Sequence, residues 1–319
     1  MLKIVVNNEE HIKKFERITW KGGINGTSRT LEVRYLDDNT IAKLGDKVEF
    51  YIDEDKLFTG KVFSVEVTGQ SQIKTFSCFD NSIYLNKNYF VKNFNKKKPS
   101  QILKEICGEL KLEVGNLPKD IVDCTYPAVN RSGYQIILNA YTIQHRKDKK
   151  IYSIVSNDGK IEVIEQGAMA DVLLHSEQDI KSSKYGEDIE KMVNQIVIYK
   201  TEKEKQQIVD KVENKEDKEK YGLFQKVMQY DKDRDNISNA KEMLKSVEKT
   251  GNITCLGNVL IQSGYSIGIH EPHTNLVGSF LVKNDTHIWE NDVYYCDVEL
   301  AFENVMDKTE FEDKPKSKK

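Results

Sequence analysis

Two stretches of this chain repeat one pattern, GDKVEFYIDEDKLFTGKVFSV from Gly45 and GYSIGIHEPHTNLVGSFLV from Gly264. In each, apolar residues alternate with polar ones as in a β-hairpin, and glycines stand where a turn or a close backbone approach is needed. The matching residues are Gly45, Val48, Phe50, Leu57 and Gly60 in the first stretch and Gly264, Ile267, Ile269, Leu276 and Gly278 in the second, after a slip of one residue before the last glycine. The repeat predicts two related β domains, although unrelated hairpins also share such patterning.

The remaining sequence fits this duplication. A length of 319 residues exceeds the usual size of one hydrophobic core. Short alternating segments dominate residues 18–79 and return after residue 251, whereas helical periods lie between them. We therefore expect a mainly β chain with an α+β insertion. The predicted domains are a first β-barrel-like domain at 1–95, an α+β domain at 96–177, a second β-barrel-like domain at 178–308, and a disordered tail at 309–319.

Three helices and one tight hairpin are predicted between the repeated stretches. The segment PSQILKEICGELKLEVG places its apolar residues on one helical face. Ser132 and Gln135 have the spacing of a capping box for the second helix. The third helix is expected from Ser238 to Gly251. Asp158-Gly159 is a dipeptide typical of a tight hairpin turn.

A highly charged segment, residues 200–220, separates the apolar runs MVNQIVIYK and GLFQKVMQY. The two runs are typical of buried strands. The segment between them carries charges of both signs and no continuous apolar face, which predicts a solvated hairpin extension or a loop. It is also the first candidate for an added contact with a partner.

Composition limits the classes of function. The net charge of -3 gives no broad positive field for nucleic acid. The five cysteines are scattered and odd in number, so we expect buried thiols in a reducing compartment. No apolar run is long enough for a membrane span, and the opening MLKIVVNNEE has no signal-peptide core, so we expect a protein kept in solution.

Ser266 lies in GYSIG, which satisfies the G-x-S-x-G pattern of a hydrolase nucleophile. That motif needs a helix after the serine, but IGIHEPHTN follows and has no helical period. The acid and histidine of a triad are available only as Asp285 and His287, two residues apart, because no histidine follows Asp292 or Asp297. We therefore expect no catalytic residue.

His270, Glu271 and His273, with His287 further on, form the grouping that most suggests a metal site. Two histidines three residues apart suit a helix or turn, but on a strand they point to opposite faces. We expect loop histidines that face solvent, and no metal. The sequence has no phosphate-binding loop, dinucleotide glycine motif or Cys-His nucleophile pair, so no cofactor and no enzymatic activity are predicted.

Several segments, in order, carry a family resemblance. ITWKGGINGTSRTLEV, LGDKVEFYIDEDKLFTGKVFSV and FSCFDNSIYLNKNY resemble the opening of PBSX-type prophage tail proteins of the late control D, or baseplate hub, class. KYGEDIEKMVNQIVIY, YGLFQKVMQYD and LVGSFLVKNDTHIW follow in that family's order. The resemblance covers nearly the whole chain, and its motifs are patterns of turns and strands rather than catalytic residues.

The resemblance implies a trimeric hub at the baseplate of a contractile tail, in a myophage or an R-type bacteriocin. It implies synthesis in the bacterial cytoplasm and incorporation into the particle. The implied partners are further copies of the chain in a homotrimer, the tail tube protein, the central spike protein and other baseplate proteins. The resemblance also implies that the two β-barrel domains of each chain are tube-like. Three such chains would present six near-equivalent units to the tube and three identical units to the spike.

Two other classes of function stay open at this point. A cell-wall (peptidoglycan) hydrolase associated with a phage tail would use Ser266 or a carboxylate pair that the sequence does not reveal. A carbohydrate-binding β module would need an exposed aromatic platform. The 15 tyrosines and 12 phenylalanines could supply such a platform, but the sequence does not locate it.

Overall fold

The chain forms two compact units, residues 1–184 with the segment from 251 onwards, and residues 185–250. We call them the large unit and the small unit. The computed structural model describes residues 1–302 except 13–14, 27, 37–41, 68, 70–71, 203–204 and 233. The predicted tail at 309–319 lies outside the described residues. The predicted domain boundaries stay a prediction.

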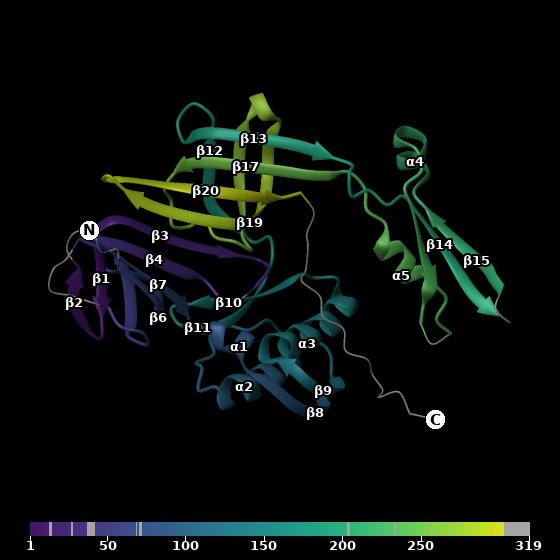
Figure 1. Cartoon of the computed structure of the whole chain (residues 1–319), viewed down its shortest axis with the longest axis horizontal. Coiled ribbons are helices and arrows are strands. Elements are labelled where there is room, and N and C mark those ends of the chain that lie inside the picture. Colours follow the sequence, from purple (N-terminus) through teal and green to yellow (C-terminus); the bar gives the residue numbers. More distant parts are fainter. Residues whose placement is uncertain are drawn as a thin grey trace. The chain divides into compact units, whose positions relative to one another are not determined.

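One sheet of 13 strands contains most of the β structure (Figure 1). Neighbouring strands run in the order β13-β17-β20-β19-β3-β4-β7-β6-β5-β1-β2, with β18 beside β19 and β12 beside β18. The strands are β1 (Leu2–Val6), β2 (Glu9–Ile12), β3 (Phe15–Gly23), β4 (Thr30–Leu36), β5 (Lys47–Ile52), β6 (Asp55–Val67), β7 (Ile73–Asp80), β12 (Met169–His175), β13 (Ile180–Asp188), β17 (Glu248–Leu256), β18 (Ser266–Glu271), β19 (Leu276–Glu290) and β20 (Val293–Ala301).

The strands form where apolar residues alternate with polar ones. In β4, every second residue from Leu31 to Tyr35 is buried while the residues between them are not. Such a period of two places one face of a sheet in the core and the other in contact with water. The main buried residues of this core are Ile4, Ile18, Trp20, Leu31, Val33, Tyr35, Val48, Phe50, Phe76 and Cys78.

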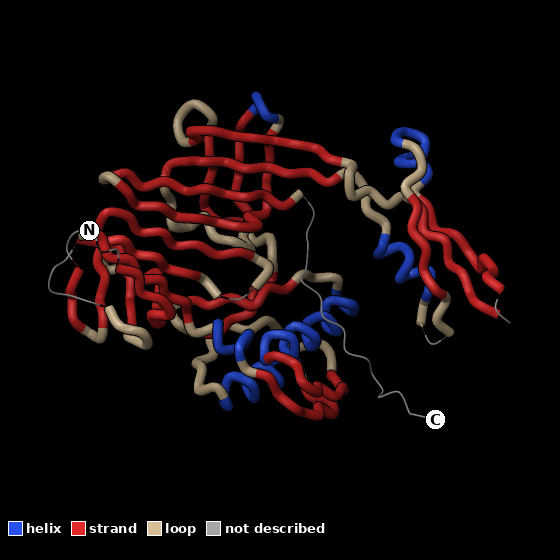
Figure 2. Tube along the Cα trace, in the orientation of Figure 1, coloured by secondary structure: helices blue, strands red, loops and turns tan. Residues whose placement is uncertain are grey.

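An α+β part separates the two ends of this sheet along the chain, and its helices lie against a pair of strands (Figure 2). The predicted capping box is confirmed, because Ser132 Oγ accepts from Gln135 N at 3.2 Å. The predicted hairpin is also confirmed, with positive φ at Asp158 and Gly159. The elements are α1 (Ile83–Lys87), β8 (Tyr89–Lys97), α2 (Pro99–Glu109), β9 (Cys124–Ser132), α3 (Gly133–Asp148), β10 (Tyr152–Asn157) and β11 (Lys160–Glu165).

The small unit is a three-stranded sheet packed against a helix. β14 (Gln195–Glu202) pairs with β15 (Lys205–Glu213) on one side and with β16 (Gln225–Gln229) on the other. Buried residues of β14 contact Ala240 of α5 (Asn236–Met243). Most of the charged segment at 200–220 is therefore in regular structure, since β15 leads into α4 (Lys215–Tyr221).

The third predicted helix is shorter than expected. It begins after Asp235, whose side chain accepts from Ser238 N at 3.1 Å, and it ends at Met243 rather than Gly251. Lys245 exchanges two backbone hydrogen bonds of 2.9 Å with Val193. The strand β17 then begins at Glu248. Pairing with distant strands therefore overrides the local helical pattern.

The mainly β fold with an α+β insertion and two related β domains is confirmed. The five cysteines are buried and free, as the sequence predicted. No helix among the described residues is long and apolar enough to cross a membrane.

Candidate functional site

The same order of strands occurs twice in the large sheet. In the first copy, defined as β1 and β3 to β7, neighbours run β3-β4-β7-β6-β5-β1. In the second copy, defined as β12, β13 and β17 to β20, neighbours run β13-β17-β20-β19-β18-β12. Each strand thus has a counterpart in sequence order and in sheet order. They differ in that β1 is antiparallel to β5, whereas β12 is parallel to β18.

The predicted repeated hairpins are β5–β6 and β18–β19. Gly45 N donates to Val62 O, and Gly264 N donates to Val282 O, both at 2.9 Å. The two glycines have positive φ, 87° and 93°, a conformation that favours glycine. A β-bulge follows Val62 in β6 and Val282 in β19. The shared hydrogen bond and bulge allow each residue of one hairpin to be matched with the residue at the same pairing position, here called its ladder position, in the other.

Not every predicted residue pair shares a ladder position. Four buried apolar residues do, two in each hairpin: Val48, Phe50, Ile267 and Ile269. The later glycines do not, because Gly60 lies opposite Val48 whereas Gly278 lies opposite Ile269. Likewise, Leu57 is the extra residue of a bulge, whereas Leu276 pairs directly with Glu271.

The strand β19 joins the two copies. Its first part pairs with β18, and its second part, from Asn284 to Glu290, pairs antiparallel with β3 of the first copy. The cores also merge at this junction, because Trp289 packs into the core of the first copy with its ring 5.1 Å from Phe50. The two copies therefore form one continuous sheet.

A network of buried polar side chains crosses the junction. Arg29, between β3 and β4, forms a two-point ion pair with Asp285 of β19. His287 Nε2 lies 3.2 Å from Asp285 Oδ2. On the other side of the ring, His287 Nδ1 lies 2.8 Å from the Tyr294 hydroxyl and 3.1 Å from Cys296 Sγ. These contacts tie the first copy to β19 and β20 of the second.

The pKa shifts of three groups in this network, Asp285, His287 and Cys296, favour their charged forms. Burial by itself would raise the pKa of Asp285, but the Arg29 guanidinium and the hydrogen bond from His287 outweigh burial and hold that pKa well below its usual range. Burial likewise opposes charge on His287, yet its contacts with Asp285 and Cys296 raise its pKa. A hydrogen bond from Cys255, and then His287, lower the pKa of the Cys296 thiol.

The network contains the parts of a Cys-His-Asp triad but is closed to substrate. Cys296, His287 and Asp285 are each 0% exposed. Both ring nitrogens of His287 already have partners, since Nε2 also lies 2.9 Å from Ile261 O. Catalytic histidines need a ring nitrogen within reach of a substrate proton. We therefore interpret the network as a structural tie between β3 and β19.

The structure does not bring Ser266 into a triad. Ser266 begins β18, is 7% exposed, and pairs with Leu281 before the junction. The strand continues to Glu271 without the strand-to-helix turn of a nucleophile elbow. Asp285 and His287 lie in the other part of β19, inside the buried network. The other acid, Asp297, accepts from the Thr254 hydroxyl at 2.6 Å.

Of the predicted histidine grouping, the structure brings together Glu271 and His273, whose Nδ1 lies 3.2 Å from Glu271 Oε1, and it separates His270 and His287 from them. Glu271 caps the short turn η1 (Pro272–Thr274), accepting from His273 N at 3.0 Å. His270 instead faces His175 of β12, with ring centroids 5.8 Å apart. His287 belongs to the junction network. Among the residues that the structure describes, no three His, Cys, Asp or Glu side chains are grouped as a metal site.

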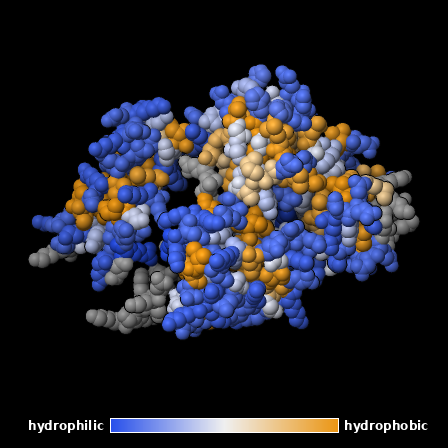
Figure 3. Space-filling view, turned by 180° about the vertical axis from the view of Figure 1, so that it is seen from behind, coloured by the Kyte–Doolittle hydropathy of each residue, from blue (hydrophilic) through white to orange (hydrophobic). Residues whose placement is uncertain are grey.

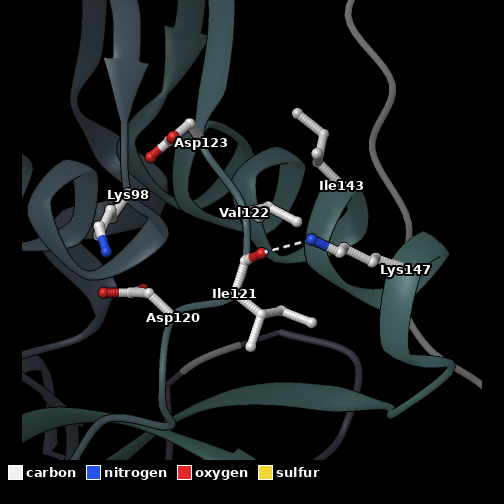
Figure 4. A pocket seen from close by; sticks show the side chains of 7 residues that line it. All are labelled: Lys98, Asp120, Ile121, Val122, Asp123, Ile143 and Lys147. Carbon is white, nitrogen blue, oxygen red and sulfur yellow. Dashed lines mark hydrogen bonds between the residues drawn. The ribbon is translucent and has the colours of Figure 1, made fainter.

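A pocket of about 430 Å³ lies in the α+β part, beside the start of α2 and the end of α3 (Figure 4). The side chains of Lys98 and Asp120 point toward each other across it. Asp120 also accepts from the Ser100 hydroxyl at 2.6 Å, and Lys147 Nζ donates to Ile121 O at 3.0 Å. Several of its polar groups thus tie residues 119–123 to the two helices. No pattern in the sequence predicts this pocket.

The junction network was not predicted from the sequence. Its signal was weak but present: Asp285 and His287 alternate on one face of the apolar run LVKNDTHIW. Arg29, the partner of Asp285, is 256 residues away in sequence, and no local pattern links the two.

Comparison with known proteins agrees with the fold. The family described as YQBQ-like matches residues 18–301. The phage-like element PBSX protein XkdQ of Bacillus subtilis is 22% identical over 304 residues, covering 86% of this chain and 89% of XkdQ. The predicted resemblance to PBSX-type prophage tail proteins is confirmed.

Two solved structures share the fold at low sequence identity. The 43 kDa tail protein of prophage MuSo2 from Shewanella oneidensis has a TM-score of 0.74 at 10% identity, covering 94% of this chain and 97% of that one. A tail protein from Neisseria meningitidis has a TM-score of 0.70 at 13% identity, covering 94% and 95%. The fold is thus that of phage tail proteins, and the chain belongs to the YQBQ-like family.

Proposed function

We propose that this protein is a structural subunit of a contractile-tail baseplate hub, in which three chains form a ring between the six-fold tail tube and the three-fold spike. The observation that carries the proposal is the strand order that occurs twice in one continuous sheet. Three such chains would present six similar sheets in one direction and three identical chains in the other. The family relative XkdQ, from a phage-like element, supports this role.

The proposed partners follow from this role. They are two further copies of the chain, the tail tube protein, the spike protein and other baseplate proteins. A hub of this kind works through large contact areas and symmetry, so it needs no catalytic group. The small unit, which includes most of the charged segment at 200–220, is the proposed place for a further baseplate contact.

The test is the mass of the full chain in solution, measured by light scattering alone and after mixing with the matching spike protein. We expect a trimer, or a monomer that becomes a complex of three chains with three spike subunits. A chain that stays monomeric with the spike, and in isolated baseplates, would contradict the proposal.

A peptidoglycan hydrolase that uses Ser266 is the alternative function. The burial of Ser266 within a paired strand disfavours it. The variant Ser266→Ala separates the two functions: a structural hub assembles normally with this variant. A reproducible loss of peptidoglycan cleavage would instead favour the hydrolase.

A further inference from the structure

Two counterpart strands, β6 and β19, differ in what lies along one edge. The second part of β19 has β20 on one side and β3 on the other, through Glu290. The second part of β6 has β7 on one side, but on the other side β5 pairs only as far as Lys61. Among the described residues, no strand pairs with Phe63–Val67 on that side. The edge that β3 covers in the second copy is therefore open in the first.

The open edge of β6 carries an exposed apolar side chain, as is typical of an edge that pairs with another strand. Apolar residues reach the surface of the large unit in several places (Figure 3). On the open edge Val67 is 59% exposed, whereas the ring of Phe63, 40% exposed, packs against Phe79 of β7 with the ring centroids 5.2 Å apart. Counted from the shared bulge, Val67 holds the ladder position of His287, which is 0% exposed and lies opposite Trp20 of β3. Open strand edges with exposed apolar residues promote pairing with another chain.

The partner that fits this edge is also present in the chain. In the first copy, β3 is the strand that covers β19, and its counterpart in the second copy is β13. Within the described sheet, β13 has β17 as its neighbour and ends the row of strands. The outer edge of β13 thus corresponds to the edge that β3 uses in the junction.

We infer that β13 of one chain pairs antiparallel with Phe63–Val67 of β6 in a neighbouring chain, repeating between chains the β3–β19 junction found within one chain. The inference rests on the proposed ring of chains and names its contact. Such a contact is heterologous, because it joins two different edges, and repeated contacts of this kind close into a ring when the rotation allows. Main-chain hydrogen bonds along the two edges would supply the affinity.

The matching ladder positions of the two copies also predict which residues of β13 and β6 lie opposite each other. Thr30 pairs with Lys21 in the first copy, and its counterpart Thr250 donates its hydroxyl to the Gly186 carbonyl. Tyr185 therefore holds the position of Trp20, which lies opposite His287. Since Val67 is the counterpart of His287, we expect Val67 of one chain to lie opposite Tyr185 of the next.

Cysteine cross-linking tests this register. The double variant V67C/Y185C, oxidised mildly in the oligomer formed alone or with spike protein, is expected to yield a covalent band of three chains. The native cysteines are all buried, so they do not interfere. The matched control V67C/K184C moves one cysteine to the opposite face of the strand, and its cross-linking yield should be at least tenfold lower.

A second pair of variants addresses the edge without cysteines. Val67→Asp should abolish the oligomer while leaving the melting temperature of the monomer unchanged, because Val67 is exposed within one chain. Val277→Asp is the control, since Val277 is 53% exposed on the first part of β19 and should leave assembly intact.

The outcomes separate this inference from the proposed function. If chains assemble into trimers that cross-link no better at Val67/Tyr185 than in the control, the edge pairing is overturned and the hub stands. If V67C/Y185C cross-links into rings that never bind the spike protein or enter particles, the edge pairing holds and the hub fails. Assembly by Val67→Asp as efficient as wild type would also overturn the pairing.

Discussion

The strands β6 and β19 occupy the same place in two copies of one sheet, yet they carry opposite chemistry. Val65 and Val67 of β6 lie at the ladder positions of Asp285 and His287 of β19. The polar pair is buried beside β3, where Asp285 is paired with Arg29 and His287 with Asp285, whereas Val67 is exposed. The two strands thus share their backbone pairing. Their side chains differ according to the far edge of each strand, where β3 lies beside β19 and, among the described residues, no strand of the same chain lies beside the second part of β6.

The largest expected effect comes from breaking the buried ion pair. Arg29→Met leaves the Asp285 carboxylate buried without its cation, which should lower the free energy of unfolding by about 3–5 kcal/mol. Urea unfolding at pH 7 measures the change. The Asp285 pKa is depressed in the folded state, so the stability from this pair is present above the unfolded pKa of about 4 and is lost as the pH falls below it.

Arg17 is the matched control in the same pair of strands. Its Nη1 lies 3.8 Å from Glu290 Oε1, and the two side chains are 33% and 30% exposed. Arg17→Ala should cost less than about 1 kcal/mol, because water screens this pair. Equal losses for the two arginine variants would show that burial does not distinguish the two ends of the junction.

The two hairpin glycines offer a second comparison. Both have positive φ, but a Cβ added at Gly264 would lie 2.9 Å from Ile164 Cδ1, whereas one at Gly45 meets nothing within 4 Å. We expect Gly45→Ala to cost about 1–2 kcal/mol from backbone strain and Gly264→Ala about 2–4 kcal/mol from strain plus overpacking. Thermal unfolding of both variants checks the order, and a larger loss at Gly45 would contradict it.

Two aspartates buried in the same sheet, Asp80 and Asp285, have pKa values shifted in opposite directions, so their effects on stability should depend on pH with opposite signs. Burial raises the pKa of Asp80 to about 6, against hydrogen bonds from Ser82 and Arg29 N. Because this folded pKa exceeds the unfolded value of about 4, the stability from Asp80 is present below pH 4 and is lost as the pH rises through 6. Relative to Asp80→Asn, the wild type should lose on the order of 2 kcal/mol between pH 4 and 7. Parallel pH profiles for the two proteins, measured by urea unfolding, would exclude this titration.

The smallest effect is expected at the open edge. Val67→Ala should change the free energy of unfolding of the single chain by less than about 0.5 kcal/mol, because the side chain is largely in water. His287→Ala removes a buried group at the same ladder position, so its cost should be several times larger. Unfolding of dilute monomer measures both variants. A large loss for Val67→Ala would mean that this edge is already covered within one chain.

Local signals predicted the local structure well. The hairpins at Gly45 and Gly264, the capping box at Ser132 and the turn at Asp158-Gly159 each depend on residues close in sequence. Their conformations follow from turn and capping chemistry that a short segment contains. These local elements could therefore be expected before the structure was known.

Long-range pairing is what the sequence could not show. The junction between β3 and β19, and the ion pair between Arg29 and Asp285, join residues from opposite ends of the chain. Hydrophobic alternation marks a strand but does not say which strand lies beside it. The same limit explains the overextended third helix, where Lys245 pairs with Val193 instead of continuing the helix.

The place of the small unit in the chain has a practical consequence for protein engineering. The chain enters the small unit from β13 and leaves it into β17, and these two strands are neighbours in the sheet. Near the ends of the two strands, the Thr250 hydroxyl donates to the Gly186 carbonyl. An inserted domain whose ends are adjacent leaves its host free to fold around it. A reporter or a targeting module could therefore replace residues 189–247, which connect β13 to β17, without interrupting the sheet.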